Sequence, residues 1–317
     1  MPYAELLCCS NFTFQRGASH ARELVQRAKE LGYAAIAITD ECTLAGIVRA
    51  HEAATETGIK LLIGSHFRFD EGDRVVVLTP TQNSYSQLCE LITLGRRNSA
   101  KGTYRLSRAD FHEKISECIA LWIPSSQIDP DQAAWLTSLK LAAAYIGFTH
   151  DLAQDSDRRL DTLRHLGHSL SLPLTAVGDV YYHVRERRRL HDVMTAIRHK
   201  TTVDKIGRRG LPNGEHHLRP LVTLRRLYPP DLLETTVKIA DACSFSLKEL
   251  HYEYPEELVP PGLTPSEHLR DLTERGAHKR WPTGMPDAIR AQIERELQLI
   301  KELKYEHFFL TDRKSVV

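Results

Sequence analysis

The first part of the chain alternates short apolar runs with longer segments of helical periodicity. Seven runs are apolar enough to be strands, and the segments between most of them repeat apolar residues every three or four positions. This alternation is typical of βα units and of a parallel sheet with its helices outside, which can close into a barrel. The pattern predicts parallel strands at 4–7, 34–39, 59–64, 74–79, 118–123, 143–149 and 174–178, and helices at 20–31, 44–57, 84–97, 131–141 and 157–170.

The alternation ends after residue 184, where proline and glycine become frequent. We therefore predict two domains, an α/β barrel at 1–184 and a mostly helical unit at 185–317, which suits a chain of 317 residues. In the last predicted helix Ile289, Ile293, Leu297 and Ile300 form one apolar stripe, so we expect that face to pack against another element. The predicted helices of this second domain are 187–198, 230–242, 265–276 and 286–303.

Charge is balanced overall but not along the chain. There are 42 Lys and Arg against 41 Asp and Glu, yet residues 183–226 hold twelve of the former and four of the latter. Such a segment is either a solvated helical face or a surface that contacts phosphates. The candidate DNA-backbone contacts in it are Arg187, Arg188, Arg189, Arg198, Lys200, Arg208 and Arg209.

The cysteines and the hydropathy pattern limit the class of protein. The six cysteines show no CxxC spacing, so reduced thiols are expected and a zinc finger is not. No apolar run reaches the roughly 18 residues that a membrane span needs, and the N-terminus has no signal-peptide pattern. We expect a soluble, cytoplasmic protein.

Five of the predicted strands end in residues that can bind a metal. These residues are Cys8 with Cys9, Asp40 with Glu41, His66, His150 and Asp179. The carboxyl ends of barrel strands are where α/β barrels carry their sites. Clustered His, Asp and Glu at such a place can hold the metal ions that hydrolyse a phosphate ester.

Several segments resemble a known family. YAELLCCSNFTF at 3–14, AITDECTLAG at 37–46 and GDVYYH at 178–183 are similar to motifs of the polymerase and histidinol phosphatase (PHP) domain of bacterial C-family, error-prone DNA polymerases. LPNGEHHLRP at 211–220, HYEYPEELVPPG at 251–262 and ELQLIKELKYEHFFLT at 296–311 resemble later parts of the same enzymes. The resemblance implies a PHP-type distorted (β/α)7 barrel, followed by the start of a polymerase palm domain.

The chain departs from the PHP pattern at most of its metal ligands. The family has His-x-His where this chain has Leu7 and Cys9, and it has histidine where this chain has Glu41. A glutamate is expected in place of His66, and histidines are expected near Arg74 and in place of Tyr181. Leucine cannot bind a metal, and an arginine adds a repelling charge.

The surviving candidate ligands are Asp40, His150, Asp179 and His183. We expect so reduced a set to hold no metal cluster, which would leave the PHP site inactive. An alternative is that Cys9, Glu41 and His66 together restore one metal position, since all three side chains can bind zinc. Each survivor also has a structural interpretation: Asp40 as a helix cap, His150 as a surface histidine and Asp179 as the anchor of a turn.

The resemblance also implies a function for the parent protein. That function is DNA-directed DNA polymerisation in damage-tolerant, translesion synthesis and repair, with DNA and dNTPs as substrates. The sliding clamp and accessory mutagenesis proteins are the implied partners. In the family, two Mg²⁺ are held by palm aspartates that would follow Val317. Residues 312–317 also depart from the helix that the resemblance predicts. We therefore expect an N-terminal fragment that is inactive alone.

Two other functions stay open on the sequence alone. The barrel could act as a metal-dependent phosphoesterase or exonuclease through the remaining ligands. The chain could instead be a non-catalytic scaffold that binds DNA or protein partners through its basic segment.

Overall fold

The computed structural model describes residues 1–250 and 259–315. The chain divides into two compact units, Met1–Leu250 and His251–Val317, and each is described by itself below. Of the segment 251–262 quoted above for its resemblance, residues 251–258 lie outside the described part. Among the described residues, no helix has both the length and the apolar character required to traverse a lipid bilayer.

The first unit is built on one seven-stranded sheet in which the strands follow their chain order. All seven predicted strands are confirmed, but the expectation that all are parallel is wrong: β4 runs antiparallel to both of its neighbours. Only residues 69–73 separate β3 from β4, which is too short for the crossover that a parallel pair requires. The strands are β1 (Ala4–Glu5), β2 (Ala35–Ile38), β3 (Lys60–Arg68), β4 (Arg74–Leu78), β5 (Ile119–Trp122), β6 (Ala143–Phe148) and β7 (Leu174–Ala176).

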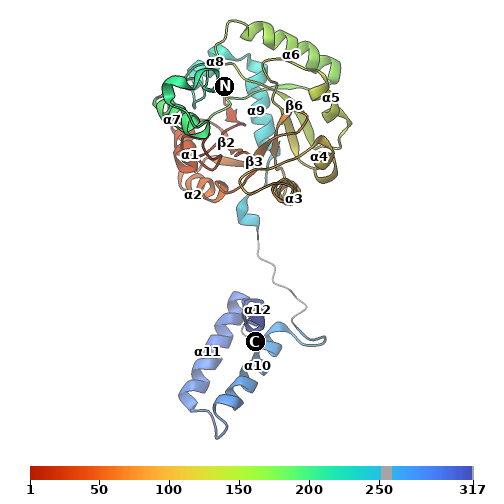
Figure 1. The fold of residues 1–317 in the computed structure, drawn as a ribbon. Coiled ribbons are helices and arrows are strands. Elements are labelled where there is room, and N and C mark those ends of the chain that lie inside the picture. The colour runs from red at the N-terminus through yellow and green to blue at the C-terminus, as the bar shows by residue number, and fades with distance from the viewer. Residues whose placement is uncertain (251–258, 316–317) are drawn as a thin grey trace. The chain divides into compact units, whose positions relative to one another are not determined.

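The sheet curls until the segments just beyond β1 and β7 pair with each other, which confirms the distorted barrel. Figure 1 shows the strands enclosed by the surrounding helices. Closure uses one parallel bridge between Cys8 and Val180, just beyond the ends of β1 and β7. The amide of Cys9 donates to the carbonyl of Val180 at 2.8 Å. The buried carboxylate of Glu5 accepts from the amide of Gly178 at 3.0 Å. The seam is therefore held by a few specific hydrogen bonds and not by a full strand pair.

Alternation along the strands divides the core into two layers. In β4, Val76 and Leu78 belong to a cluster inside the barrel, whereas Val75 and Val77 belong to the larger cluster beneath the surrounding helices. Successive side chains of a strand point to opposite faces, so a strand buried on both faces is apolar throughout. The continuous apolar runs of the sequence come from this double burial.

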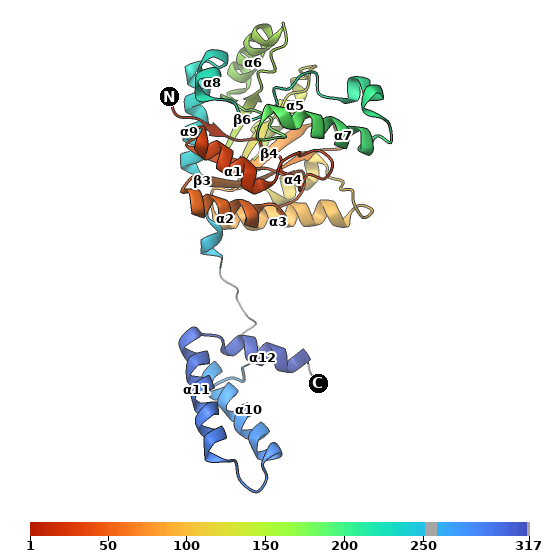
Figure 2. The ribbon, with the colours of Figure 1, turned by 90° about the vertical axis from the view of Figure 1, so that its left-hand side faces the viewer.

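Helices surround the barrel, as Figures 1 and 2 show. The predicted helix at 131–141 is shorter than expected, with a single helical turn followed by a 3₁₀ turn at Trp135–Ser138. A helix that was not predicted begins after Ser107, whose side chain caps it by accepting from the amide of Asp110. The helices of the first unit are α1 (Ala21–Glu30), α2 (Ile47–Thr57), α3 (Gln82–Arg97), α4 (Arg108–Lys114), α5 (Asp131–Ala134), α6 (Ser156–Leu170), α7 (Arg188–Arg198), α8 (Leu221–Leu227) and α9 (Pro230–Ala242).

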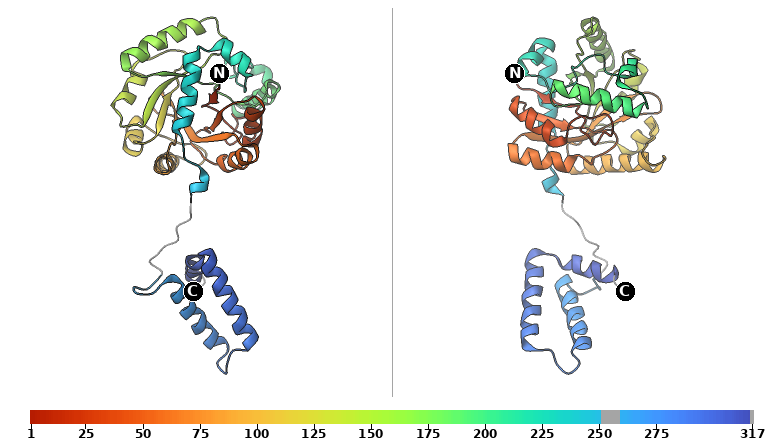
Figure 3. Two further views of the ribbon diagram at one scale, coloured as in Figure 1. Left: turned by 180° about the vertical axis from the view of Figure 1, so that it is seen from behind. Right: turned by 60° about the vertical axis from the view of Figure 1, so that its left-hand side comes forward.

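The expected division after residue 184 does not coincide with the division between compact units. Helix α9 contacts β1 and β7 and lies across one end of the ring of strands (Figure 3). Its Ile239 and Ala240 complete the cluster inside the barrel. The hydroxyl of Thr236 accepts from the amide of Ala4 at 3.0 Å. Because α9 supplies part of the barrel core, the compact unit extends to Leu250.

The second unit contains α10 (Pro265–Arg280), α11 (Asp287–Leu303) and α12 (Glu306–Ser315). The prediction that the apolar face of the 286–303 helix packs is confirmed: Ile289, Ile293 and Leu297 form a half-buried face of α11, which contacts α10. A bidentate pair between Arg270 and Glu294, at 2.6 and 2.8 Å, joins the same two helices.

Candidate functional site at the mouth of the barrel

The carboxyl ends of the parallel strands gather most of the predicted site residues at one end of the barrel. Because β4 is antiparallel, its first residue, Arg74, lies at this same end. Its guanidinium forms a bidentate ion pair with Asp179, which follows β7, at 2.7 and 3.0 Å. The same guanidinium donates to the hydroxyl of Tyr181 at 3.2 Å. A permanent cation thus lies against the carboxylate that the sequence suggested as a metal ligand.

This ion pair is almost fully withdrawn from water. The side chains of Arg74 and Asp179 are 9% and 13% exposed. Burial raises the pKa of the Asp179 carboxyl, but the charge and hydrogen bonds of Arg74 more than offset this and hold it below its usual range. Asp179 has φ +47°, a left-handed conformation that aspartate tolerates at turns. Asp179 therefore does anchor the turn after β7, through a charged partner.

Asp40 is also fully engaged by neighbouring protein groups. One carboxylate oxygen accepts from the amide of Ser10 at 2.7 Å and from the hydroxyl of Thr13 at 2.6 Å. The other accepts from the hydroxyl of Ser10 at 2.7 Å. Burial raises its pKa, and these hydrogen bonds oppose the rise. Asp40 holds the loop after β1 and does not cap the following helix.

Cys9, His66 and Glu41 are adjacent, but their geometry does not suit a single metal ion. His66 Nδ1 donates to the carbonyl of Thr39 at 2.6 Å, and the thiol of Cys9 is 3.8 Å from that same nitrogen. Glu41 lies on the other ring nitrogen, Nε2, at 3.8 Å. The imidazole therefore stands between the thiol and the carboxylate. Burial together with Arg74 lowers the pKa of His66 to about 4, so this ring is neutral at pH 7.

Glu41 is the centre of a second charged network. It pairs with Arg16 at 3.2 Å and with Arg68 at 3.9 Å, and it accepts from the hydroxyl of Tyr104 at 3.0 Å. Burial raises its pKa, but His66 and the two arginines more than offset this and lower it overall. Its carboxylate oxygens are thus shared among cationic and hydroxyl partners.

His150 and His183 lie apart from these groups. The ring of His150 packs edge-on against Phe148 and Tyr228. His183 Nδ1 is 2.7 Å from the hydroxyl of Ser19, at the start of α1. Across residues 1–250 and 259–315, no three His, Cys, Asp or Glu side chains are grouped so that they could hold a metal ion. The donor set therefore does not fit the metal cluster that the PHP resemblance implies.

Two kinds of site residue escaped sequence reasoning. His216 donates through Nδ1 to the backbone carbonyl of Asp179 at 2.8 Å, although only its place in the 211–220 motif hinted at a role. Ser10 and Thr13, which donate hydrogen bonds to Asp40, are the second kind. Their positions within the 3–14 motif are the only sequence signal for them.

Some cations of the basic segment contact other groups of the protein, and others are exposed to solvent. Arg187 pairs with Glu23, Arg188 is 3.5 Å from Asp192, and Arg198 donates to the carbonyl of Gln15 at 3.2 Å. These three side chains are half-buried and have structural roles. The exposed members are Arg189, Lys200, Arg208 and Arg209.

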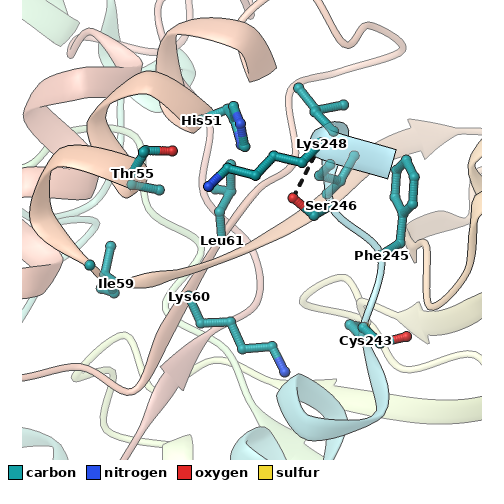
Figure 4. A pocket seen from close by; sticks show the side chains of 14 residues that line it. His51, Thr55, Ile59, Lys60, Leu61, Cys243, Phe245, Ser246 and Lys248 are labelled. Carbon is teal, nitrogen blue, oxygen red and sulfur yellow. Dashed lines mark hydrogen bonds between the residues drawn. The ribbon is translucent and has the colours of Figure 1, made fainter. Parts of the chain in front are cut away.

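A separate pocket of about 450 Å³ lies at the amino-terminal end of β3, opposite the mouth of the barrel. Figure 4 shows the side chains that line it. It is lined by the start of β3, where Lys60 begins the strand, and by residues 243–248 that follow α9. His51, Lys60 and Lys248 supply its ionisable nitrogens, alongside the thiol of Cys243. Burial raises the pKa of that thiol to about 12, so it is not a reactive thiolate. None of the predicted site residues lies here.

Comparison with known families agrees with the geometry of the barrel and with the sequence of the second unit. Residues 5–161 match the PHP domain, and residues 267–316 match the family described as the bacterial DNA polymerase III alpha NTPase domain. Proteins named error-prone DNA polymerase match nearly the whole chain: one from Pseudomonas savastanoi pv. phaseolicola is 50% identical over 313 residues, 98% of this chain. The chain is therefore similar to error-prone DNA polymerases over nearly all of its length.

Two further proteins named error-prone DNA polymerase match equally well. The protein from Methylococcus capsulatus is 50% identical over 310 residues, and the one from Pseudomonas aeruginosa is 50% identical over 309 residues. In each comparison the match covers 98% of this chain but 30% of the relative. The chain therefore spans about 30% of the length of the error-prone DNA polymerases that it matches.

Solved structures similar to the chain are more distant. A structure described as a metal-dependent phosphoesterase from Bifidobacterium adolescentis aligns with a TM-score of 0.45 and 16% identity, over 71% of this chain and 95% of its own. An amidohydrolase from Chromobacterium violaceum aligns with a TM-score of 0.41 and 14% identity, over 56% and 87%.

Proposed function

We propose that the chain is the N-terminal part of an error-prone, DNA-directed DNA polymerase that acts in damage-tolerant synthesis and repair. The observation that carries this proposal is the 50% identity to proteins of that name, continuous over 98% of the chain and therefore over both units. In the proposal, DNA and dNTPs are the substrates, and residues 185–317 include the beginning of the palm. Mg²⁺ is bound by aspartates of the remaining palm, the sliding clamp and accessory mutagenesis proteins are partners, and the protein acts in the cytoplasm.

The barrel in this proposal has a structural and not a hydrolytic role. Hydrolysis of a phosphate ester by clustered metals requires several ligands with free lone pairs. Here Asp179 is paired with Arg74, and Asp40 accepts three hydrogen bonds from Ser10 and Thr13. Both carboxylates are committed to holding the barrel mouth together, which argues against the phosphoesterase alternative.

The exposed cations of the basic segment are proposed as backbone contacts for DNA. Arg189, Lys200, Arg208 and Arg209 have the required accessibility. Contacts of this kind depend on charge and carry no base specificity. Binding of single- or double-stranded DNA that weakens steeply with salt would support this part of the proposal.

A chimeric enzyme tests the polymerase proposal directly. The matching N-terminal segment of the Pseudomonas aeruginosa relative is replaced by this chain, and the chimera is assayed for primer extension with Mg²⁺ on undamaged and lesion-containing templates. We expect extension on both templates, because the graft exchanges matched segments that are 50% identical. A chimera that is folded but extends neither template would contradict the proposal. Turnover of nitrophenyl phosphate by the isolated chain would favour the phosphoesterase alternative.

A further inference from the structure

A polar cavity of about 300 Å³ opens at the mouth of the barrel beside the Arg74–Asp179 pair. Its wall contains three arginines and a histidine: Arg68 from the end of β3, Arg74 from the start of β4, Arg159 from α6 and His216. The volume is at the lower end of the range for small-molecule sites, which is roughly 300 to 1,000 Å³. Such a wall favours a small anion.

Three residues lining this cavity carry buried polar atoms that lack a hydrogen-bond partner within the described part of the chain. The atoms are Nε of Arg74, Nε of Arg159 and Oγ1 of Thr149. Arg74 itself is 8% exposed. Native proteins pair almost all of their buried polar groups, so unsatisfied donors along one cavity indicate a missing acceptor. A group with several acceptor oxygens meets that need.

The cavity has two carboxylates, Asp179 and Asp151, against three arginines. Asp179 is neutralised by Arg74, as described above. Asp151 accepts from the hydroxyl of Ser156 and from the amide of Ala153, both at 3.1 Å. Arg159 has no carboxylate partner within salt-bridge distance among the described residues, and the distance from Arg68 to Glu41 is 3.9 Å. The cavity therefore has positive charge that its own acids do not neutralise.

We propose that this cavity binds a phosphate dianion without any metal ion, through Arg68, Arg159, Thr149 and the free Nε of Arg74. Guanidinium groups suit phosphate because they donate in a planar fork and stay charged at all physiological pH values. The phosphate can come from inorganic phosphate or from the 5′ end of a nucleic acid. Both sources share the dianionic group that the donors recognise.

Isothermal titration of the 317-residue chain in the presence of EDTA tests the proposal. The probes are inorganic phosphate and a pair of short oligothymidylates, one with a 5′-phosphate and one with a 5′-hydroxyl. The test variant is Arg159→Ala, and the control is Arg158→Ala, which removes the neighbouring, exposed arginine of the same helix. If Arg159→Ala lowers the stability of the protein, Thr149→Val replaces it as the test variant, because it removes only the hydroxyl donor.

We expect phosphate to bind to the wild type, and Arg159→Ala to weaken binding by about tenfold or more, the usual loss for one charge-assisted donor. Arg158→Ala should change the affinity by less than about twofold, since Arg158 is exposed and does not line the cavity, so that its charge acts on the phosphate only through screened attraction. Tighter binding of the 5′-phosphorylated strand than of free phosphate would identify a nucleic-acid end as the source, and equal binding would identify free phosphate. No binding in EDTA, or equal losses in the two arginine variants, would overturn the proposal.

Discussion

Replacement of Arg74 by methionine tests how the barrel mouth is held together. Methionine keeps much of the side-chain volume but removes the guanidinium that pairs with Asp179 at 2.7 and 3.0 Å. The carboxylate of Asp179 would stay buried, because its side chain is 13% exposed, and it would no longer have a permanent cation beside it. The ring of His216 lies 3.8 Å from that carboxylate. Loss of one partner of a buried pair costs about 3–5 kcal/mol, a large share of the roughly 5–15 kcal/mol that stabilises a typical domain.

Urea unfolding at pH 7, followed by circular dichroism, measures this cost for Arg74→Met. The control is Arg105→Met, which breaks a pair of equal length, 2.7 Å, between side chains that are 72% and 43% exposed. Loss of that exposed pair should cost far less, because water and salt screen the attraction between its charges. The double variant Arg74→Met with Asp179→Leu should recover part of the loss, because no charge is then left unpaired.

The loss of stability in Arg74→Met should depend on pH in a direction that follows from the pKa of Asp179. Arg74 holds the pKa of Asp179 below its usual range, so the pair contributes stability above the unfolded-state pKa of about 3.9 and loses it as pH falls through the lower, folded-state value. In Arg74→Met, the main influence that lowers the pKa of Asp179 is gone, so burial raises it against the weaker opposing effects of His216 and His66. The difference between wild type and variant should therefore be largest near pH 7 and shrink toward pH 3. A cost below about 1 kcal/mol, or a cost that does not change with pH, would refute the reasoning.

Three further predictions follow from the same geometry. Gly178→Ala should destabilise the first unit by roughly 1–3 kcal/mol in thermal unfolding, because a Cβ there would overlap the carboxylate of Glu5; an unchanged melting temperature would show that the seam can adjust. In native protein at pH 8, iodoacetamide should modify the half-exposed Cys89 and leave Cys9 unmodified, since burial raises the pKa of Cys9 and blocks access; rapid labelling of Cys9 would contradict the buried mouth. If the exposed arginines contact DNA, Arg208→Ala with Arg209→Ala should reduce the slope of log affinity against log salt by roughly 1.5 to 2, whereas an unchanged slope would remove both from the interface.

Much of the barrel could be predicted from hydrophobic patterning. The strands are buried on both faces, so each produces a continuous apolar run that stands out in the sequence. Strand direction did not follow from the runs themselves: the antiparallel β4 depends on the short connection at 69–73, which is a feature of spacing. The division between compact units after Leu250 did not follow from the sequence, because α9 packs on β1 and β7 far earlier in the chain, and sequence periodicity carries no information about such contacts.

The candidate site was predictable in its position but not in its chemistry. Asp40 and Asp179 follow predicted strands, and their placement at one end of the barrel follows from that fact. Their partners are less accessible to sequence reasoning, since Arg74 pairs with a residue more than one hundred positions away. Ser10 and Thr13 act on Asp40 through a loop whose path depends on the whole barrel.

The most direct test of the central claim is elemental analysis of the chain, purified without chelator and exchanged into buffer with zinc and manganese at micromolar concentration. If the ion pair of Arg74 and the hydrogen bonds of Asp40 replace the metal cluster, the protein retains no stoichiometric metal after gel filtration, and its melting temperature is the same with and without EDTA. Retention of two or more zinc or manganese ions per chain, with a melting temperature that falls on chelation, would contradict the account.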